Sequence, residues 1–166
     1  MPDDPFAIFE LDRRFTIDEP ALRQRFLKLS AEMHPDRFPD PIEQADAVEK
    51  MSLITDAYRV LGDPESRARL LLDLSAQNDA SDRDALPPDL LMDVMDVREE
   101  MESAIDSGNA DELDRLRTWA SDRREQHLQQ LAGLLDGEIN STVAAKARLE
   151  LNALRYMQRM LEQMPD

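Results

Sequence analysis

Apolar residues along this chain recur at spacings of three and four, which is the period of a helix that buries one face. Few stretches alternate apolar and polar residues as strands do, and β-branched residues are scattered. The pattern therefore predicts an all-α fold. With proline, glycine and aspartate as boundary signals, helices are expected over about residues 5–9, 19–34, 43–61, 67–72, 88–107, 111–135 and 139–164.

The first half of the chain predicts a helical hairpin with short flanking helices. Two segments each carry one apolar stripe, and the proline-containing residues 37–42 are expected to form the loop between them. The stripes consist of Leu22, Phe26, Leu29 and Met33 in the first segment and of Ala47, Met51, Ile54, Tyr58 and Leu61 in the second. Matching stripes joined by a loop favour an antiparallel pair.

A stretch without periodicity, rich in Asp, Ser, Ala and Pro, separates the two halves. It predicts one domain over residues 1–75, a linker over 76–88 and a second domain over 89–166. In the second domain, Gly108 and Gly137 mark short connections between three long helices. Short connections favour antiparallel neighbours, so this domain is expected to be a three-helix bundle.

The first helix of the bundle has apolar residues on two faces. At about 100° per residue, one stripe points to the core; it consists of Leu90, Val94, Val97, Met101, Ala104 and Ile105. The opposite side carries Leu91, Met92 and Met95, framed by Asp96 and Glu99. Either this helix packs against two neighbours, or the second face is an exposed patch for a partner. The patch is favoured because methionine-rich apolar surfaces adapt to other proteins.

The last helix repeats this pattern more weakly. Its main stripe consists of Ala147, Leu151, Leu154 and Leu161, and three residues lie nearly opposite: Leu149, Tyr156 and Met160. Here burial against a second neighbour is the favoured interpretation.

Charge and composition narrow the possible partners. The formal net charge of −16 argues against nucleic acid, because phosphate backbones are bound by fields of Lys and Arg. The chain has no cysteine, which excludes disulfides, thiolate nucleophiles and thiolate metal sites. No secretory signal or apolar run of membrane-spanning length is present, so a cytoplasmic protein without membrane attachment is expected.

The chain offers few groups for chemistry of its own. Its two histidines are His34 and His127, and His127 falls near the apolar direction of its helix, where a hydrogen-bonded or bundle-edge histidine is expected. Nothing resembles a nucleophile elbow or a phosphate-binding glycine loop. No cofactor and no metal is predicted, and an enzyme that uses His34 as a base is the less favoured alternative. Pro35 ends the preceding helix, so His34, Asp36 and Arg37 should be presented together at a corner.

Three segments of the first half, read together, resemble a J-domain. Residues 23–29 read RQRFLKL, residues 34–38 read HPDRF, and residues 54–64 read ITDAYRVLGDP, followed by Arg67. Residues 86–101, LPPDLLMDVMDVREEM, are similar to the bundle segment of the HscB family of iron–sulfur co-chaperones. This resemblance extends from Pro5 to Met164.

The resemblance implies two partners and no catalytic residue. A J-domain docks on an ATPase chaperone, here HscA or a DnaK-class relative, and the bundle delivers the scaffold protein IscU to it. The implied chaperone-binding residues are His34, Pro35 and Asp36 at the corner that triggers ATP hydrolysis, Arg37 beside it, and Arg23, Arg25 and Lys28 on the basic side of the preceding helix. The implied scaffold-binding residues are Leu91, Met92, Met95, Asp96, Glu99, Leu149 and Tyr156.

Departures from the family pattern leave alternatives open. Ser103 stands where some relatives carry an acid, and the last helix lacks an aromatic residue near Leu149 or Glu150. One alternative is a J-domain protein that serves a general DnaK-class chaperone with a different client. A structural all-α protein with an accidental tripeptide is another. The exposed patch would also allow weak self-association when no scaffold is bound.

Overall fold

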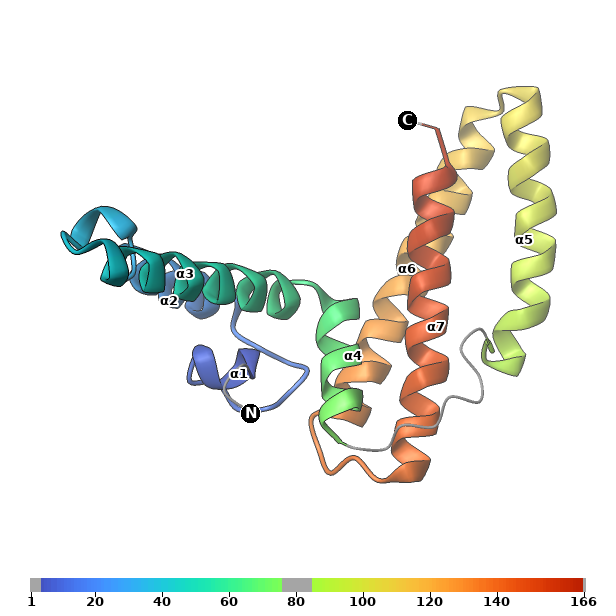
Figure 1. Ribbon diagram of the computed structural model, residues 1–166. Helices are drawn as coiled ribbons and strands as arrows, with labels where there is room; N and C mark the ends of the chain where they lie inside the picture. The colour runs from blue at the N-terminus through green and yellow to red at the C-terminus, as the bar shows by residue number, and fades with distance from the viewer. Residues whose placement is uncertain (1–3, 76–84, 166) are drawn as a thin grey trace. The chain divides into compact units, whose positions relative to one another are not determined.

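The computed structural model describes residues 4–75 and 85–165, and these form seven α-helices, one short 3-10 helix and no strand (Figure 1). The helices are α1 (Pro5–Ile8), α2 (Glu19–Glu32), η1 (Pro35–Arg37), α3 (Pro41–Gly62), α4 (Pro64–Leu74), α5 (Pro88–Ser107), α6 (Ala110–Leu135) and α7 (Ser141–Gln163). The all-α prediction is confirmed. Most of the predicted linker, residues 76–84, lies outside the described residues. The chain divides into two compact units between Leu71 and Leu72, inside α4.

Aspartate caps followed by proline begin the helices of the first unit. Asp4 accepts a hydrogen bond from the Phe6 amide at 3.0 Å, and Asp18 accepts one from the Ala21 amide at 2.9 Å. Asp40 does the same for the Ile42 amide at 2.8 Å, so α3 begins at Pro41. The predicted loop over residues 37–42 was therefore too long, because its proline opens the next helix.

Aromatic and aliphatic side chains fill the core of the first unit, where α2 and α3 lie side by side (Figure 1). Phe6, Phe9 and Leu22 are fully buried. The ring of Phe26 stacks on that of Tyr58 with 4.2 Å between centroids, and Phe9 meets Tyr58 edge-on at 6.5 Å. The predicted stripes therefore hold the two helices of the hairpin together.

The second unit is built from α5, α6 and α7, which share one core. Leu90, Leu116 and Met157, one from each helix, are at most 1% exposed. One prediction for an individual residue was wrong. Ile105 is 39% exposed because it lies about 60° from Leu90, at the edge of the stripe. Met160 is buried in the core shared with α5, and for this residue the expected burial of the second apolar face of α7 is confirmed.

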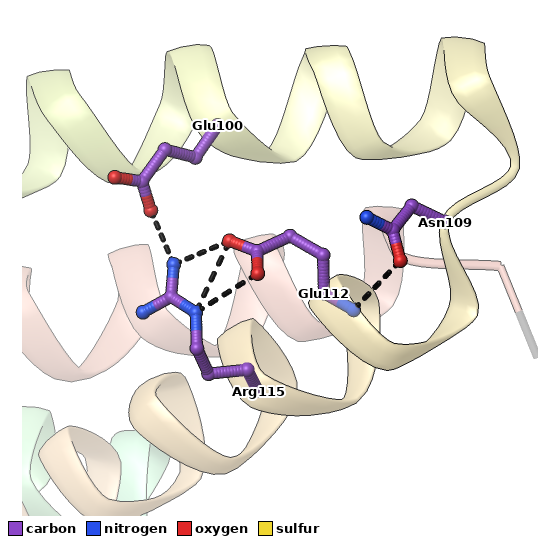
Figure 2. Close-up of polar contacts among 4 residues, drawn as sticks. All are labelled: Glu100, Asn109, Glu112 and Arg115. Atoms are coloured by element: carbon purple, nitrogen blue, oxygen red, sulfur yellow. Dashed lines mark hydrogen bonds and ion pairs between the residues drawn. The ribbon is translucent and has the colours of Figure 1, made fainter.

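A polar cluster closes the connection between α5 and α6 (Figure 2). Gly108 takes the left-handed conformation at φ 64°, and the Asn109 side chain caps α6 by accepting from the Glu112 amide at 3.2 Å. Arg115 bonds both Glu112 on its own helix and Glu100 on α5. The hydrogen bond from Arg115 holds the pKa of the Glu112 carboxyl below its ordinary value, and the same bond raises the pKa of Arg115.

Among the described residues, none of the helices combines the length and the apolar character that crossing a membrane requires.

Candidate functional site

The corner between α2 and α3 is held by its own side chains. Met33 ends α2, and His34 leaves the helix in an extended conformation because Pro35 follows it. The Asp36 amide donates to Nδ1 of His34 at 3.3 Å, so the imidazole caps η1. A nitrogen that accepts a hydrogen bond carries no proton, which assigns the imidazole proton to Nε2.

This assignment decides between two contacts of the same nitrogen. Nδ1 of His34 also lies 3.7 Å from Oδ2 of Asp36, but an ion pair there requires a protonated Nδ1. The amide contact is the shorter, and with a neutral imidazole the Asp36 carboxylate has no ion pair at the corner. Its side chain is 85% exposed and that of His34 is 58% exposed. The corner thus presents an acceptor, Asp36, and a donor, Nε2 of His34.

Arg37 connects the corner to α2 by a hydrogen bond. Its Nη1 donates to the carbonyl of Ala31 at 3.0 Å, in the last turn of α2, where carbonyls lack partners within the helix. Arg37 was predicted to contact the chaperone. The structure gives its guanidinium a bond within the corner, while its side chain remains exposed.

A hollow of about 280 Å³ lies beside the corner, between Pro35 and one face of α3. Val48 and Met51 line it, and Val48 is 54% exposed. Val48 is not among the residues predicted for the site. Val48 directly follows the buried Ala47 and faces solvent, where a polar residue is expected. An apolar residue at such a position is the sequence feature that could have identified it.

The three cations of α2 do not form one patch. Arg25 donates to the carbonyls of Phe9 and Glu10, at the end of α1, the latter at 2.8 Å. Arg23 points about 160° away from Arg25 around the helix. Within the described residues, Arg23 and Lys28 are exposed and form no ion pair. These two cations are therefore available to a partner, whereas Arg25 has a structural bond.

The second face of α5 is exposed. Leu91, Met92 and Met95 are 52%, 75% and 68% exposed, and the neighbouring acids Asp96 and Glu99 are exposed too. The prediction of a solvent-facing apolar patch, rather than a helix buried between two neighbours, is confirmed. We call these five residues the α5 patch. On α7, Leu149 and Tyr156 are half-buried.

The remaining histidine is a structural residue. His127 is 8% exposed, and its Nδ1 lies 2.7 Å from Oε2 of Glu150, which joins α6 to α7. This confirms the expected hydrogen-bonded histidine. Over residues 4–75 and 85–165, no group of three or more His, Cys, Asp or Glu side chains is arranged to hold a metal ion.

A capped His-Pro-Asp corner between two packed helices, followed by a separate helical bundle, defines a J-domain co-chaperone. Two family models agree with this class: the DnaJ domain matches residues 4–70, and the HSCB C-terminal oligomerisation domain matches residues 86–164.

Full-length relatives identify the family. The chain is 33% identical to the co-chaperone protein HscB homolog of Azoarcus sp., over 100% of this chain and 94% of that protein. It is 34% identical to the homolog of Paraburkholderia phymatum, over 89% of this chain and 86% of that protein. The chain belongs to the HscB co-chaperone family. Membership implies a DnaK-class chaperone as a partner.

Solved structures agree with this assignment. Chaperone HscB from Vibrio cholerae superposes with a TM-score of 0.79 at 28% identity, covering 97% of this chain and 94% of that one. Human co-chaperone protein HscB superposes with a TM-score of 0.81 over 97% of this chain and 80% of that one; at 21% identity this likeness shows a shared fold.

Proposed function

We propose that this protein is a cytoplasmic co-chaperone that stimulates the ATPase of an HscA-type chaperone and delivers an IscU-type iron–sulfur scaffold to it. The protein itself catalyses no reaction. The observation that carries the proposal is the His34 corner, where one imidazole nitrogen caps the backbone and the Asp36 carboxylate is exposed to a partner. The alternative, a general DnaK-class chaperone with a different client, uses the same corner and differs in what the α5 patch binds.

Stimulation requires that the corner bind the states of the chaperone unequally, because a ligand shifts an equilibrium only by its differential affinity. An exposed carboxylate held in one place can pair with a cationic group that the chaperone presents in its hydrolysing state. Fixing the backbone of Asp36 beforehand lowers the ordering cost that docking would otherwise incur. His34 therefore acts as a positioning residue for Asp36.

The free cations of α2 contribute to encounter. In a chain of net charge −16, Arg23 and Lys28, which point about 140° apart around α2, give this helix an exposed positive surface. An acidic region on the chaperone would attract this surface and repel most of the remaining protein, which favours one orientation and a faster association.

The α5 patch supports the delivery role. Leu91, Met92 and Met95 keep more than half of their surface exposed, and Asp96 and Glu99 can pair with cations of a scaffold. Because both partners bind one chain, binding the scaffold raises its local concentration beside the chaperone. We infer that Leu149 and Tyr156, half-buried on α7, contribute less contact area than the α5 residues.

The test compares two variants that divide the functions of the imidazole. In His34→Asn, the side-chain oxygen lies close to the position of Nδ1 and can still accept a hydrogen bond from the Asp36 amide. In His34→Gln, the side-chain amide lies one methylene further out, so the hydrogen bond that caps η1 is lost. In a steady-state ATPase assay of purified HscA with and without IscU, His34→Gln should abolish stimulation and His34→Asn should retain part of it. Both variants should give the circular dichroism of the wild type, because the corner is exposed.

Normal stimulation by His34→Gln would refute the assignment of the corner. The same assay separates the two candidate clients. Wild-type protein and IscU that stimulate HscA more than additively support the scaffold role, and stimulation that ignores IscU supports the general chaperone alternative.

A further inference from the structure

A second hollow, of about 250 Å³, lies in the bundle between α5 and α7. Met101 and Met160 form its floor and are 5% and 3% exposed. Its walls are polar: Arg98 from α5, and Tyr156, Arg159 and Gln163 from α7. This is a concave site with an apolar base and several convergent polar groups, which is the general form of a ligand subsite.

The charge of the hollow is opposite to that of the protein. Acidic residues outnumber Lys and Arg by 36 to 20 in the chain, yet two guanidinium groups line this one hollow. Arg98 has a single exposed ion pair, with Glu102 at 3.3 Å, and such i,i+4 surface pairs are weak. Arg159 forms no ion pair within the part of the chain that the structure describes.

Two guanidinium groups, a phenol and an amide make a site for a carboxylate. Guanidinium groups bind carboxylates through two parallel hydrogen bonds, and the Tyr156 hydroxyl and Gln163 amide can donate further ones. A carboxylate bound between them would be attracted by both guanidinium groups.

The hollow adjoins the α5 patch. Around α5, Arg98 points within about 20° of Leu91, while Asp96 points about 140° away from Leu91 on the other side of the patch. The apolar surface is thus flanked on one edge by the guanidinium groups of the hollow, where Glu102 pairs weakly with Arg98, and on the opposite edge by Asp96. A partner whose surface carries the complementary charges can dock in one direction only, because the reversed orientation would place like charges together.

We propose that Arg98 and Arg159, with Tyr156 and Gln163, form a carboxylate subsite that receives an acidic side chain of the scaffold and fixes its orientation on the α5 patch. This inference rests on the proposed scaffold role of that patch. It adds a cationic contact to a surface whose predicted residues are apolar, aromatic or acidic, and it gives Tyr156 a hydrogen-bonding role.

The first test uses a small probe that does not depend on the scaffold. The arginine Nε–Hε signals of the full chain are followed by NMR while acetyl-glutamate-amide is added, with acetyl-glutamine-amide as the uncharged control. Selective, saturable shifts of Arg98 and Arg159 with the glutamate probe are expected. Equal responses to both probes would overturn the subsite.

The second test measures scaffold binding by calorimetry. The double variant Arg98→Gln/Arg159→Gln should weaken binding of IscU roughly tenfold, with a smaller salt dependence than the wild type. Lys146→Gln is the matched control, since Lys146 is an exposed cation of α7 outside the hollow, and its affinity should stay within about twofold. Equal affinities of the double variant and the control would overturn the proposal. Failure of the scaffold role itself looks different: the wild type then binds no IscU, and the peptide probe still decides whether the hollow takes a carboxylate.

Discussion

Removing the apolar side chains of the α5 patch should separate scaffold binding from folding. The triple variant Leu91→Ala/Met92→Ala/Met95→Ala removes three large side chains that are 52%, 75% and 68% exposed. Their loss costs the folded protein little, since each lies mostly in water. Alanine also has the highest intrinsic helix propensity, which offsets part of that small cost.

The effect on binding follows from the area still exposed. Full burial of a Leu or Met side chain contributes about 1.5–3 kcal/mol, so docking can recover about 1–2 kcal/mol from each of the three. Alanine keeps its Cβ, and truncations within one interface are not additive. We therefore expect a combined loss of about 2–4 kcal/mol, which corresponds to a rise in Kd of roughly 30- to 1,000-fold.

The assay is isothermal titration of IscU into the variant, with Ile42→Ala as a matched control. Ile42 is 74% exposed on α3, so its truncation removes a similarly exposed apolar side chain from the other unit. The control should bind IscU like the wild type. Basal stimulation of HscA without IscU should persist in both proteins, because their His34 corners are intact.

An unchanged Kd in the triple variant, with circular dichroism showing a folded protein, would refute the reasoning. Exposure would then reflect ordinary surface apolarity, which is common in soluble proteins.

Two further predictions concern residues that the structure places in stabilising contacts. Arg25→Ala removes the bonds to the carbonyls that end α1 and should lower the unfolding free energy by about 1–2 kcal/mol. Arg23→Ala should change the unfolding free energy by about 0.5 kcal/mol or less and mainly slow association with the chaperone. Equal melting temperatures for the two variants would contradict this. For Glu112, the hydrogen bond from Arg115 lowers the folded-state pKa, so the stabilisation is present above the unfolded pKa and disappears as the pH falls through the folded one. Glu112→Gln should therefore melt below the wild type at neutral pH and converge with it in acid, and a difference that persists in acid would exclude this cause.

The helix pattern was predictable from sequence because local signals agree with one another. Asp18 followed by Pro20 sets the start of α2, and the apolar stripe of α3 matches its buried residues Ala47, Ile54 and Leu61. The patch was predictable for the same reason, since apolar residues opposite a complete core stripe have no place in a small bundle.

Contacts between distant segments were not predictable in this way. Nothing local in the sequence indicates that Arg25 reaches the end of α1 or that Met160 faces the core shared with α5. Helical periodicity gives the direction of a side chain on its own helix but not the neighbour that lies there. Arg25 was therefore predicted as a chaperone-binding residue, and its hydrogen bonds to the end of α1 were not foreseen.

Unpaired cations are the most informative residues of such an acidic protein. With 36 acidic residues in 166, several arginines pair with a carboxylate, as Arg115, Arg117 and Arg123 do. A cation that stays exposed without a strong pair is available to an acidic group of a partner. The described residues place such cations on α2 beside the His-Pro-Asp corner and at the α5–α7 hollow beside the patch. Each of the two proposed docking surfaces thus carries a positive contact, which favours a partner that is acidic at the matching position. A second copy of this protein is a poor competitor for these surfaces, because a net charge of −16 makes the copies repel one another.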